Sequence, residues 1–353
     1  MDKGKEGRKG LRDLVCLMAA GGTAGDVRPL LGLAVGLKKR GYRICFFADP
    51  GFKDLAGQKG IKGEEWFSSS LIPQPALLRT KGAQRYLWGK PPRIRDLMFI
   101  RKVQKSLAQK EEAFLKHLEA RNNSGVAASI ASLSARSVLY KFGPGCAKII
   151  SCPMPYQPSS TFSLAPSGPF FKTPIGKWLF HMLGHRRLIG FGREKYENFM
   201  RKTYHLVSVS SEFFPRPGDW LPNMQVTGYI PFQETEDWQP PDSLVQFLKN
   251  GDEPVYVGFG SLPLFSGQRG KKLAAEIIEA VSWLDLRCII QSSDLSDLSH
   301  PSNMYIMDYA APHTWLFPRC AAIVHHGGYG TTHASLSAGK PMVIYPFQTD
   351  EFL

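Results

Sequence analysis

The sequence predicts an α/β protein with two domains, each built on a parallel sheet that helices cover on both faces. Three observations support this fold class. The chain has 353 residues, which exceeds what one compact core usually serves. Short apolar runs recur along it. Amphipathic stretches with helical spacing lie between many of these runs, and this alternation favours parallel sheets.

The apolar runs are short enough to be strands, and we find no internal repeat of fixed period among them. We expect strands at Leu14–Ala19, Arg43–Ala48, Val126–Ile130, Ala147–Cys152, Leu206–Ser210, Val255–Gly260, Arg287–Ile290, Met304–Met307, Ala321–His325 and Pro341–Tyr345.

Two helices stand out between the strands. Leu30, Leu33, Ala34 and Leu37 share one helical face directly after the first strand. A second, basic helix is predicted where residues of one apolar face recur over a longer stretch, at Ile100, Val103, Leu107, Phe114 and Leu118.

An acidic, proline-containing stretch, "PFQETEDWQPPDSLVQFLKNGDEP", marks the boundary between the domains. We expect a first domain at residues 11–230, a linker at 231–254 with a short helix at Ser243–Leu248, and a second domain at 255–353. The second domain stops one strand after a glycine turn, where a doubly wound domain would normally continue. We therefore expect it to be incomplete.

The composition favours a cytoplasmic protein with an anionic partner. The net charge of +14 suits nucleotide phosphate, nucleic acid or an acidic membrane, although it also suits solubility alone. The six cysteines are scattered and form no CxxC pair, as in reduced intracellular proteins. No apolar run reaches the roughly 18–20 residues of a spanning helix, and the N-terminus does not resemble a signal peptide.

The first glycine-rich turn, "AAGGTAGDVRPL", joins a strand to a helix. Gly21, Gly22 and Gly25 allow a ligand to approach the backbone closely. The GxGxxG pattern is absent, which weakens a nicotinamide interpretation. Asp26 is either the N-cap of the helix or a base that faces the crevice beyond the strand ends.

The second turn, "VYVGFGSLP", places Ser261 after a strand that ends in two glycines. Its hydroxyl and N–H groups suit an anion, although a simple strand-to-loop turn explains the pattern as well.

The third turn, "VHHGGYGTTHASLSAGKP", follows a buried strand and opens a helix. The N-terminus of such a helix binds anions, and the glycines let the backbone close around phosphate. No GK[ST] follows, so this is not a Walker loop. The predicted phosphate ligands are His326, Gly327, Gly328, Gly330, Thr331 and Thr332.

A zinc site at the same turn is disfavoured. His325 and His326 are adjacent on a strand end and so point to opposite sides. Neither they nor His333 has a cysteine or carboxylate at ligand spacing. We expect no metal here.

The stretch "APHTWLFPRCAAIVHHGGYGTTHASLSAGKPMVIYPFQTDEF" resembles the nucleotide-sugar signature of the GT-B glycosyltransferases, in particular the sterol 3-beta-glucosyltransferase branch. "GGTAGDVRPLLGLAVGLKKRGYRICFFA" is similar to the N-terminal loop of that branch. "SVSSEFFPRPGDWLPNMQVTGYI" and "PPDSLVQFLKNGDEPVYVGFGSL" resemble the segments that surround its linker. The resemblance implies a GT-B fold of two doubly wound, Rossmann-like domains that face a cleft.

The resemblance also implies roles for single residues. Asp26 would be the base that takes the proton of the acceptor hydroxyl, and direct attack would invert the anomeric centre. Neither a metal nor a further cofactor is expected, since a helix N-terminus and His326 would meet the charge of the leaving diphosphate. The donor UDP-sugar would contact Gly22, Thr23, Ser261, His313, His326, Gly327, Gly328, Gly330, Thr331, Thr332, Asp350 and Glu351.

Two positions depart from the family pattern. The donor motif of the family usually ends in Asp-Gln or Glu-Gln, whereas this chain has Asp350-Glu351. A glutamate accepts hydrogen bonds but cannot donate as an amide does, which leaves the choice of sugar open. Where plant relatives stack the base on a tryptophan, this chain has Ala310 beside Tyr309.

The acceptor side is rich in basic and aromatic residues at Pro75–Arg121 and again at Phe170–Tyr196. This mixture suits peripheral contact with an acidic membrane, where a sterol or other lipophilic acceptor would be collected. A solvated helix face explains it equally well. No RNA-binding motif accompanies it, so nucleic acid is not expected as a partner.

The resemblance, together with these observations, implies an inverting transferase that moves a hexose, with glucose favoured, from a UDP-sugar to the hydroxyl of a sterol-like lipid. One alternative is a glycosyltransferase for another hydrophobic small molecule. A second is a GT-B protein that binds a nucleotide-sugar or lipid without turnover. An NAD-dependent oxidoreductase is disfavoured, because the first loop lacks the dinucleotide fingerprint.

Overall fold

The computed structural model describes residues 14–18, 24–58, 61, 65–68, 109, 125–128, 147–152, 193–232, 238–260, 264–296 and 299–346. The chain forms two compact units. Among these residues, the first unit extends to Phe232 and the second begins at Trp238. Each unit has its own sheet and its own apolar core.

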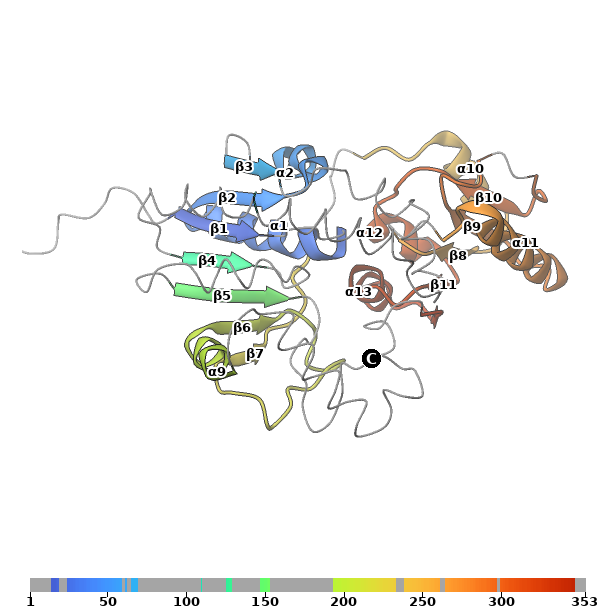
Figure 1. Ribbon diagram of the computed structural model, residues 1–353. Coiled ribbons are helices and arrows are strands. Elements are labelled where there is room, and N and C mark those ends of the chain that lie inside the picture. The colour runs from blue at the N-terminus through green and yellow to red at the C-terminus, as the bar shows by residue number, and fades with distance from the viewer. Residues whose placement is uncertain are drawn as a thin grey trace, which may run out of the picture. The chain divides into compact units, whose positions relative to one another are not determined.

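The first unit is built on a parallel sheet whose described strands have the order β3-β2-β1-β4-β5-β6-β7 (Figure 1). The order runs outward from β1 in both directions, which is the doubly wound pattern. The strands are β1 (Leu14–Met18), β2 (Arg43–Ala48), β3 (Glu65–Ser68), β4 (Gly125–Ala128), β5 (Ala147–Cys152), β6 (Tyr204–Val207) and β7 (Met224–Val226).

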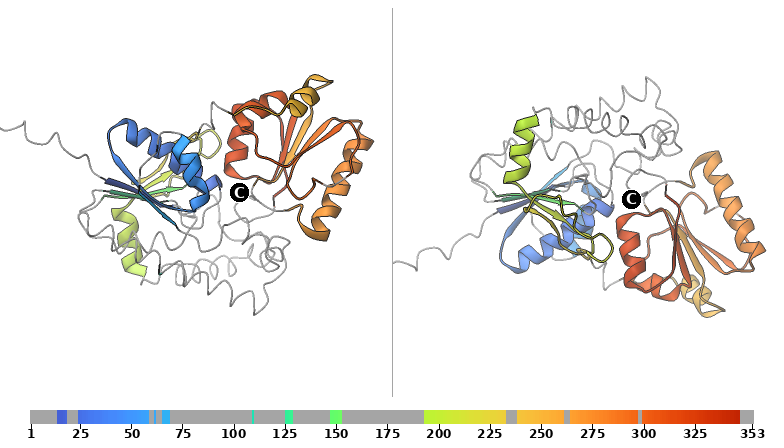
Figure 2. Two further views of the ribbon diagram at one scale, coloured as in Figure 1. Left: turned by 90° about the horizontal axis from the view of Figure 1, so that it is seen from above. Right: turned by 90° about the horizontal axis from the view of Figure 1, so that it is seen from below.

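Helix α1 (Ala24–Lys39) packs on this sheet through the predicted apolar face. Leu30 and Ala34 are buried, and they lie in one core cluster with Ile44 and Phe46 of β2. Figure 2 shows α1 and α9 (Arg193–Lys202) on opposite faces of the sheet. A 3-10 turn (Pro50–Phe52) and α2 (Lys53–Gln58) follow β2.

The first turn of α1 contains Asp26. The helix begins at Ala24, so Asp26 is its third residue and does not occupy the N-cap, which was one of the two interpretations of this position. Pro29 lies inside the helix and has no N–H group to bond with the carbonyl of Gly25. The turn that holds Asp26 therefore has one backbone hydrogen bond fewer than a regular helix.

The second unit has a parallel sheet whose described strands have the order β10-β9-β8-β11-β12. Its central strand, β8, is again the first in the sequence, so this sheet also winds outward in two directions. The strands are β8 (Val255–Gly258), β9 (Cys288–Gln291), β10 (Met304–Met307), β11 (Ala322–His325) and β12 (Met342–Ile344).

Helices cover both faces of the second sheet (Figure 2). Alternate strand residues point to opposite faces, so Val257 and Ile290 pack with α11 (Gly267–Trp283), whereas Tyr256 and Ile289 pack with the other helices. These other helices are α10 (Asp242–Lys249), α12 (His313–Leu316), the 3-10 turn Phe317–Arg319 and α13 (Tyr329–Ser337).

Helix α10 lies within the stretch that we interpreted as a linker. Its Leu244 is fully buried in the core of the second unit. The carbonyl of Phe247, also in α10, accepts a hydrogen bond from Arg287. By its packing, α10 is part of the second unit.

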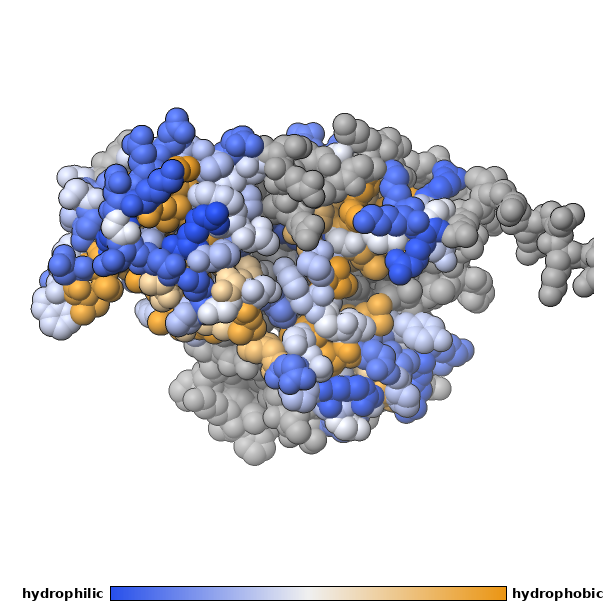
Figure 3. Space-filling view, turned by 180° about the vertical axis from the view of Figure 1, so that it is seen from behind, coloured by the Kyte–Doolittle hydropathy of each residue, from blue (hydrophilic) through white to orange (hydrophobic). Residues whose placement is uncertain are grey.

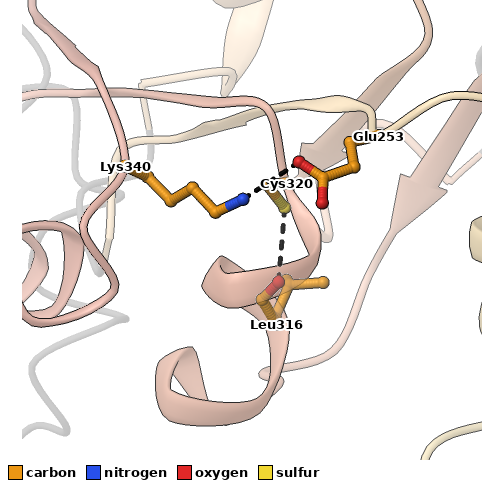
Figure 4. Close-up of polar contacts among 4 residues, drawn as sticks. All are labelled: Glu253, Leu316, Cys320 and Lys340. Carbon is orange, nitrogen blue, oxygen red and sulfur yellow. Dashed lines mark hydrogen bonds and ion pairs between the residues drawn. The ribbon is translucent and has the colours of Figure 1, made fainter.

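An ion pair fastens the start of β8 to the start of β12 in the second unit. Lys340 Nζ lies 2.9 Å from Glu253 Oε2, and Figure 4 shows the pair beside the buried thiol of Cys320. That thiol donates to the carbonyl of Leu316, and burial raises the pKa of Cys320 to about 12. The thiol is therefore protonated and part of the core.

Figure 3 shows one face of the molecule, on which apolar side chains lie among hydrophilic ones. Exposed large apolar residues include Phe213, Trp283 and Tyr345. In the described parts of the chain, none of the helices is long and apolar enough to cross a membrane.

Candidate functional site: the glycine turn of the second unit

The third glycine turn forms the strand–turn–helix unit that its sequence predicts. Strand β11 ends at His325, and α13 begins at Tyr329 with Gly328 as its N-cap residue. Gly327 has a φ of 95°, a left-handed conformation that glycine adopts without strain. The turn lies at the carboxyl end of a parallel strand, where open α/β sheets bind their ligands.

His325 is hydrogen-bonded to the backbone of this turn. Its side chain is fully buried, and its Nδ1 accepts a hydrogen bond from the N–H of Gly327 at 3.0 Å. Because Nδ1 accepts, the ring proton must be on Nε2, which lies 3.5 Å from Met342 Sδ on β12. Burial lowers the pKa of His325 from 6.5 to about 4, so the ring is neutral at neutral pH.

His326 points to the other side of the strand, and its imidazole lies between two glycines. A β-carbon at Gly260, after β8, would lie 2.9 Å from Cε1 of His326, and one at Gly328 would overlap the same ring. Both positions must therefore lack a side chain if the ring is to stay where it is.

The charge of His326 differs from our expectation that the imidazole supplies positive potential. Burial, and to a lesser degree His325, lowers the pKa of His326 from 6.5 to about 4. Before a ligand binds, the ring is therefore a neutral hydrogen-bonding group. The positive potential at this turn comes from the N-terminus of α13.

Two of the predicted phosphate donors are engaged within the turn. The N–H of Gly327 is bonded to His325, and Thr332 Oγ1 donates to the carbonyls of Gly327 and Gly328 at 3.2 and 3.1 Å. Gly330 and Thr331 lie in the first turn of α13, where N–H groups have no carbonyl partner within the helix. The backbone of this first turn and His326 are thus the groups placed to meet an anion.

His313 begins α12, which contacts α13. Its ring stacks on Phe317 with 4.3 Å between centroids and meets the edge of the Tyr256 ring at 6.3 Å. Next to it, Tyr256 donates to Gln291 Oε1, and Gln291 Nε2 donates to the carbonyl of Tyr309. This network fixes the loop that carries Tyr309 and Ala310, where the nucleotide base was expected.

The structure thus gathers seven of the predicted donor residues on one side of the second unit. Asp26 belongs to the first unit and is the third residue of α1. Five predicted residues lie outside the described parts of the chain: Gly22, Thr23, Ser261, Asp350 and Glu351. The basic, aromatic stretch from Pro75 to Arg121 also lies outside them, except for Gln109.

Sequence reasoning missed His325, Gly260 and Gln291. His325 was considered for metal binding alone, although its position two residues before Gly327 allows the Nδ1 bond. Gln291 is the polar residue that ends an apolar strand, a signal that was available. The contact of Gly260 with His326 joins two distant turns, and no local pattern indicates it.

Two family models match the chain. The glycosyltransferase family 28 N-terminal domain matches residues 16–140, and the erythromycin biosynthesis protein CIII-like C-terminal domain matches residues 275–353. Sterol 3-beta-glucosyltransferase UGT80A2 of Arabidopsis thaliana is 30% identical over 358 residues, which cover 94% of this chain and 54% of that relative. The chain belongs to the GT-B glycosyltransferases.

Other relatives and solved structures agree with this family. The sterol 3-beta-glucosyltransferase of Emericella nidulans is 35% identical over 164 residues, which cover 43% of this GT-B chain and 12% of the relative. The GT-B chain spans about half the length of the two Arabidopsis sterol 3-beta-glucosyltransferases, 54% and 56%.

Solved glycosyltransferases share the fold. The glycosyltransferase of kitacinnamycin superimposes with a TM-score of 0.62 at 17% identity, over 96% of this GT-B chain and 81% of the other. Arabidopsis thaliana UGT89C1, complexed with quercetin, gives 0.64 at 13% identity, over 97% and 81%. The two doubly wound sheets are therefore those of the GT-B fold.

Proposed function

We propose that this protein transfers a hexose, with glucose favoured, from a UDP-sugar to the hydroxyl of a sterol-like lipid. The observation that carries the proposal is the glycine turn of the second unit. There, His326 and the first turn of α13 meet at the carboxyl end of β11. The named activity of the Arabidopsis and Emericella relatives supports the sterol acceptor and the glucose donor.

On the donor side, the diphosphate would bind at the N-terminus of α13. Negative charge increases on the diphosphate as the bond to the sugar breaks, and backbone N–H groups with the helix dipole stabilise it. His326 would donate to the same oxygens. The mechanism needs no metal for this step. A solved structure of Arabidopsis UGT89C1 complexed with UDP supports the choice of nucleotide.

On the acceptor side, Asp26 would remove the proton of the attacking hydroxyl. An alcohol is a weak nucleophile at neutral pH and needs a positioned base. In-line attack on an α-linked donor would give a β-glycoside. The position of Asp26 in the first turn of α1, at the carboxyl end of β1, supports this role.

We place the protein in the cytoplasm, in peripheral contact with an acidic membrane from which it takes its acceptor. The net charge of +14 supports the membrane contact. The buried thiols of Cys45, Cys288 and Cys320 are unpaired by disulfides, which supports a reducing compartment.

The decisive experiment is to measure UDP release from UDP-glucose by the purified chain, with and without a sterol dispersed in acidic lipid vesicles. Sterol-dependent release together with a β-linked product would support the proposal. UDP binding without release under any acceptor would favour a binding protein without turnover. Release that depends on another lipophilic alcohol would reassign the acceptor and keep the reaction.

A further inference from the structure

His325 has no role in the mechanism above, yet both of its ring nitrogens are engaged. The ring is fully buried at the end of β11. Nδ1 accepts from the N–H of Gly327, and Nε2 faces Met342 Sδ on the neighbouring strand β12. A single side chain therefore links the sheet to the turn that enters α13.

The bond to Gly327 determines the direction of the backbone at the turn. In the left-handed conformation of Gly327, its N–H points back into the protein and meets Nδ1. Without this acceptor, a partly buried N–H would lose its partner, which costs free energy unless the backbone rotates. The acceptor thus favours the observed φ of 95° over other conformations open to a glycine.

A second side chain, Thr332, forms hydrogen bonds with the carbonyl groups of the same turn. Thr332 Oγ1 donates to the carbonyls of both Gly327 and Gly328. Since His325 holds the N–H side and Thr332 holds the carbonyl side, the turn has one orientation relative to α13. That orientation places Gly328 against the ring of His326.

We propose that His325 is a positioning residue of the donor site: by accepting the N–H of Gly327, it holds the glycine turn in the conformation that aligns His326 and the first turn of α13 for a diphosphate. The inference rests on the proposed function, because it assigns the role through diphosphate binding. His325 itself does not touch the ligand.

The role requires an acceptor at the position of Nδ1 and a neutral ring. The lowered pKa of about 4 keeps Nδ1 unprotonated at neutral pH, which agrees with the geometry. Asparagine places its Oδ1 close to where Nδ1 stands, whereas glutamine places its amide close to Nε2. The substitutions His325→Asn and His325→Gln are therefore a matched pair of similar polarity that separates the two nitrogens.

The test measures UDP binding by calorimetry for the wild type, His325→Asn, His325→Gln and His325→Leu, with folding checked by thermal unfolding. We expect His325→Asn to bind UDP within about threefold of the wild type. We expect His325→Gln and His325→Leu to bind at least about tenfold more weakly, which corresponds to the loss of one partly buried hydrogen bond. His205→Leu removes an equally buried histidine from β6 of the first unit, and it should leave UDP affinity unchanged.

Wild-type affinity in His325→Gln, or equal weakening in the Asn and Gln variants, would overturn the proposal. If His325→Leu does not fold, the Asn and Gln pair still decides. If the wild type does not bind UDP, the proposed function fails. The hydrogen bond between Gly327 N–H and His325 Nδ1 is then measured directly by NMR. A scalar coupling between Gly327 N and His325 Nδ1 in selectively ¹⁵N-labelled protein would keep the positioning contact, and its absence would remove it.

Discussion

The imidazole of His326 lies between Gly260 and Gly328 and is neutral in the free protein at neutral pH. The protonation state of a neutral, partly buried imidazole is sensitive to the charge of a bound ligand. A diphosphate beside the ring favours the imidazolium and so raises its pKa in the complex. Binding is then linked to proton uptake.

The first prediction concerns this proton. The pKa of His326 is about 4 in the free protein and higher in the complex. At a pH between these two pKa values, the complex therefore binds more protons than the free protein. Affinity for UDP-glucose should therefore rise as the pH falls from about 7 toward 5. UDP-glucose is the suitable ligand, because neither of its phosphates titrates in this range.

Calorimetry at about pH 6 in buffers of different ionisation enthalpy gives the number of protons taken up. His326→Asn should lose this uptake while it retains a hydrogen-bonding side chain. Uptake of the same size in His326→Asn would assign the proton to another group and contradict the prediction.

The second prediction concerns the base. Asp26→Asn should lower sterol glucosylation by on the order of 10²–10⁴-fold, the usual contribution of a positioned base. UDP affinity should stay within about threefold, because Asp26 is not in the unit that holds the glycine turn. The two quantities are measured by UDP release and by calorimetry.

Asp54→Asn is the control for this variant. Asp54 also lies in the first turn of a helix, α2, and its side chain is exposed. Its substitution should leave transfer unchanged. Equal loss of transfer and of UDP affinity in Asp26→Asn would assign Asp26 a structural role.

At the scale of the element, the turn after β8 packs against the turn after β11 through the imidazole ring of His326. Gly260 has a φ of 62°, so this turn needs glycine both for its backbone and for the space that His326 fills. These two requirements can be separated, because Gly339 has a φ of 64° with open space around it.

The third prediction uses that pair. Gly260→Ala and Gly339→Ala should each destabilise the fold by about 1–2 kcal/mol, the cost of a side chain in the left-handed region. Gly260→Ala should in addition weaken UDP binding by about tenfold, since it displaces His326. Gly339→Ala should bind UDP like the wild type. Urea unfolding and calorimetry measure the two effects, and equal UDP affinity in both variants would contradict the steric argument.

The elements themselves were largely predictable from the sequence. The strands β2, β5 and β10 have the predicted bounds, because their apolar runs are continuous and end abruptly. Two strands were missed: β3 is short and polar at its start, and β7 has three residues. Both lie at the edges of the sheet, where few neighbours impose an apolar pattern.

The candidate site was predictable in its kind but not in its detail. A strand, a glycine turn and a helix can be read locally, and this gave His326 and the residues that follow it. The engagement of Gly327 N–H and Thr332 Oγ1 within the turn depends on side-chain geometry. The neutrality of His326 depends on burial, which a local motif does not report.

At the scale of the whole molecule, the described residues of each unit form apolar core clusters of their own. Val27, Leu31 and Ile44 belong to the core of the first unit, and Ile290 and Leu316 belong to clusters of the second. A ligand of the glycine turn acts first on the second unit.

The fourth prediction follows from this separation. At a UDP concentration 100 times its Kd, the native state of the second unit gains about 2.7 kcal/mol. Hydrogen exchange measured by mass spectrometry should show added protection in β8, β11 and α13. Strand β2 is the internal reference and should change little. Equal protection of β2 and β11 would show that the two units respond as one.

The ring between two glycines also has a consequence for how variants combine. Gly260→Ala weakens donor binding through His326 alone, so the substitution should have no effect on UDP affinity once His326 is alanine. A double-mutant cycle on these two positions should therefore be strongly non-additive. For a chain that drifts in sequence, the two turns form one unit of epistasis: once His326 has been lost, replacing Gly260 no longer affects donor binding, and only the backbone cost of its positive φ remains.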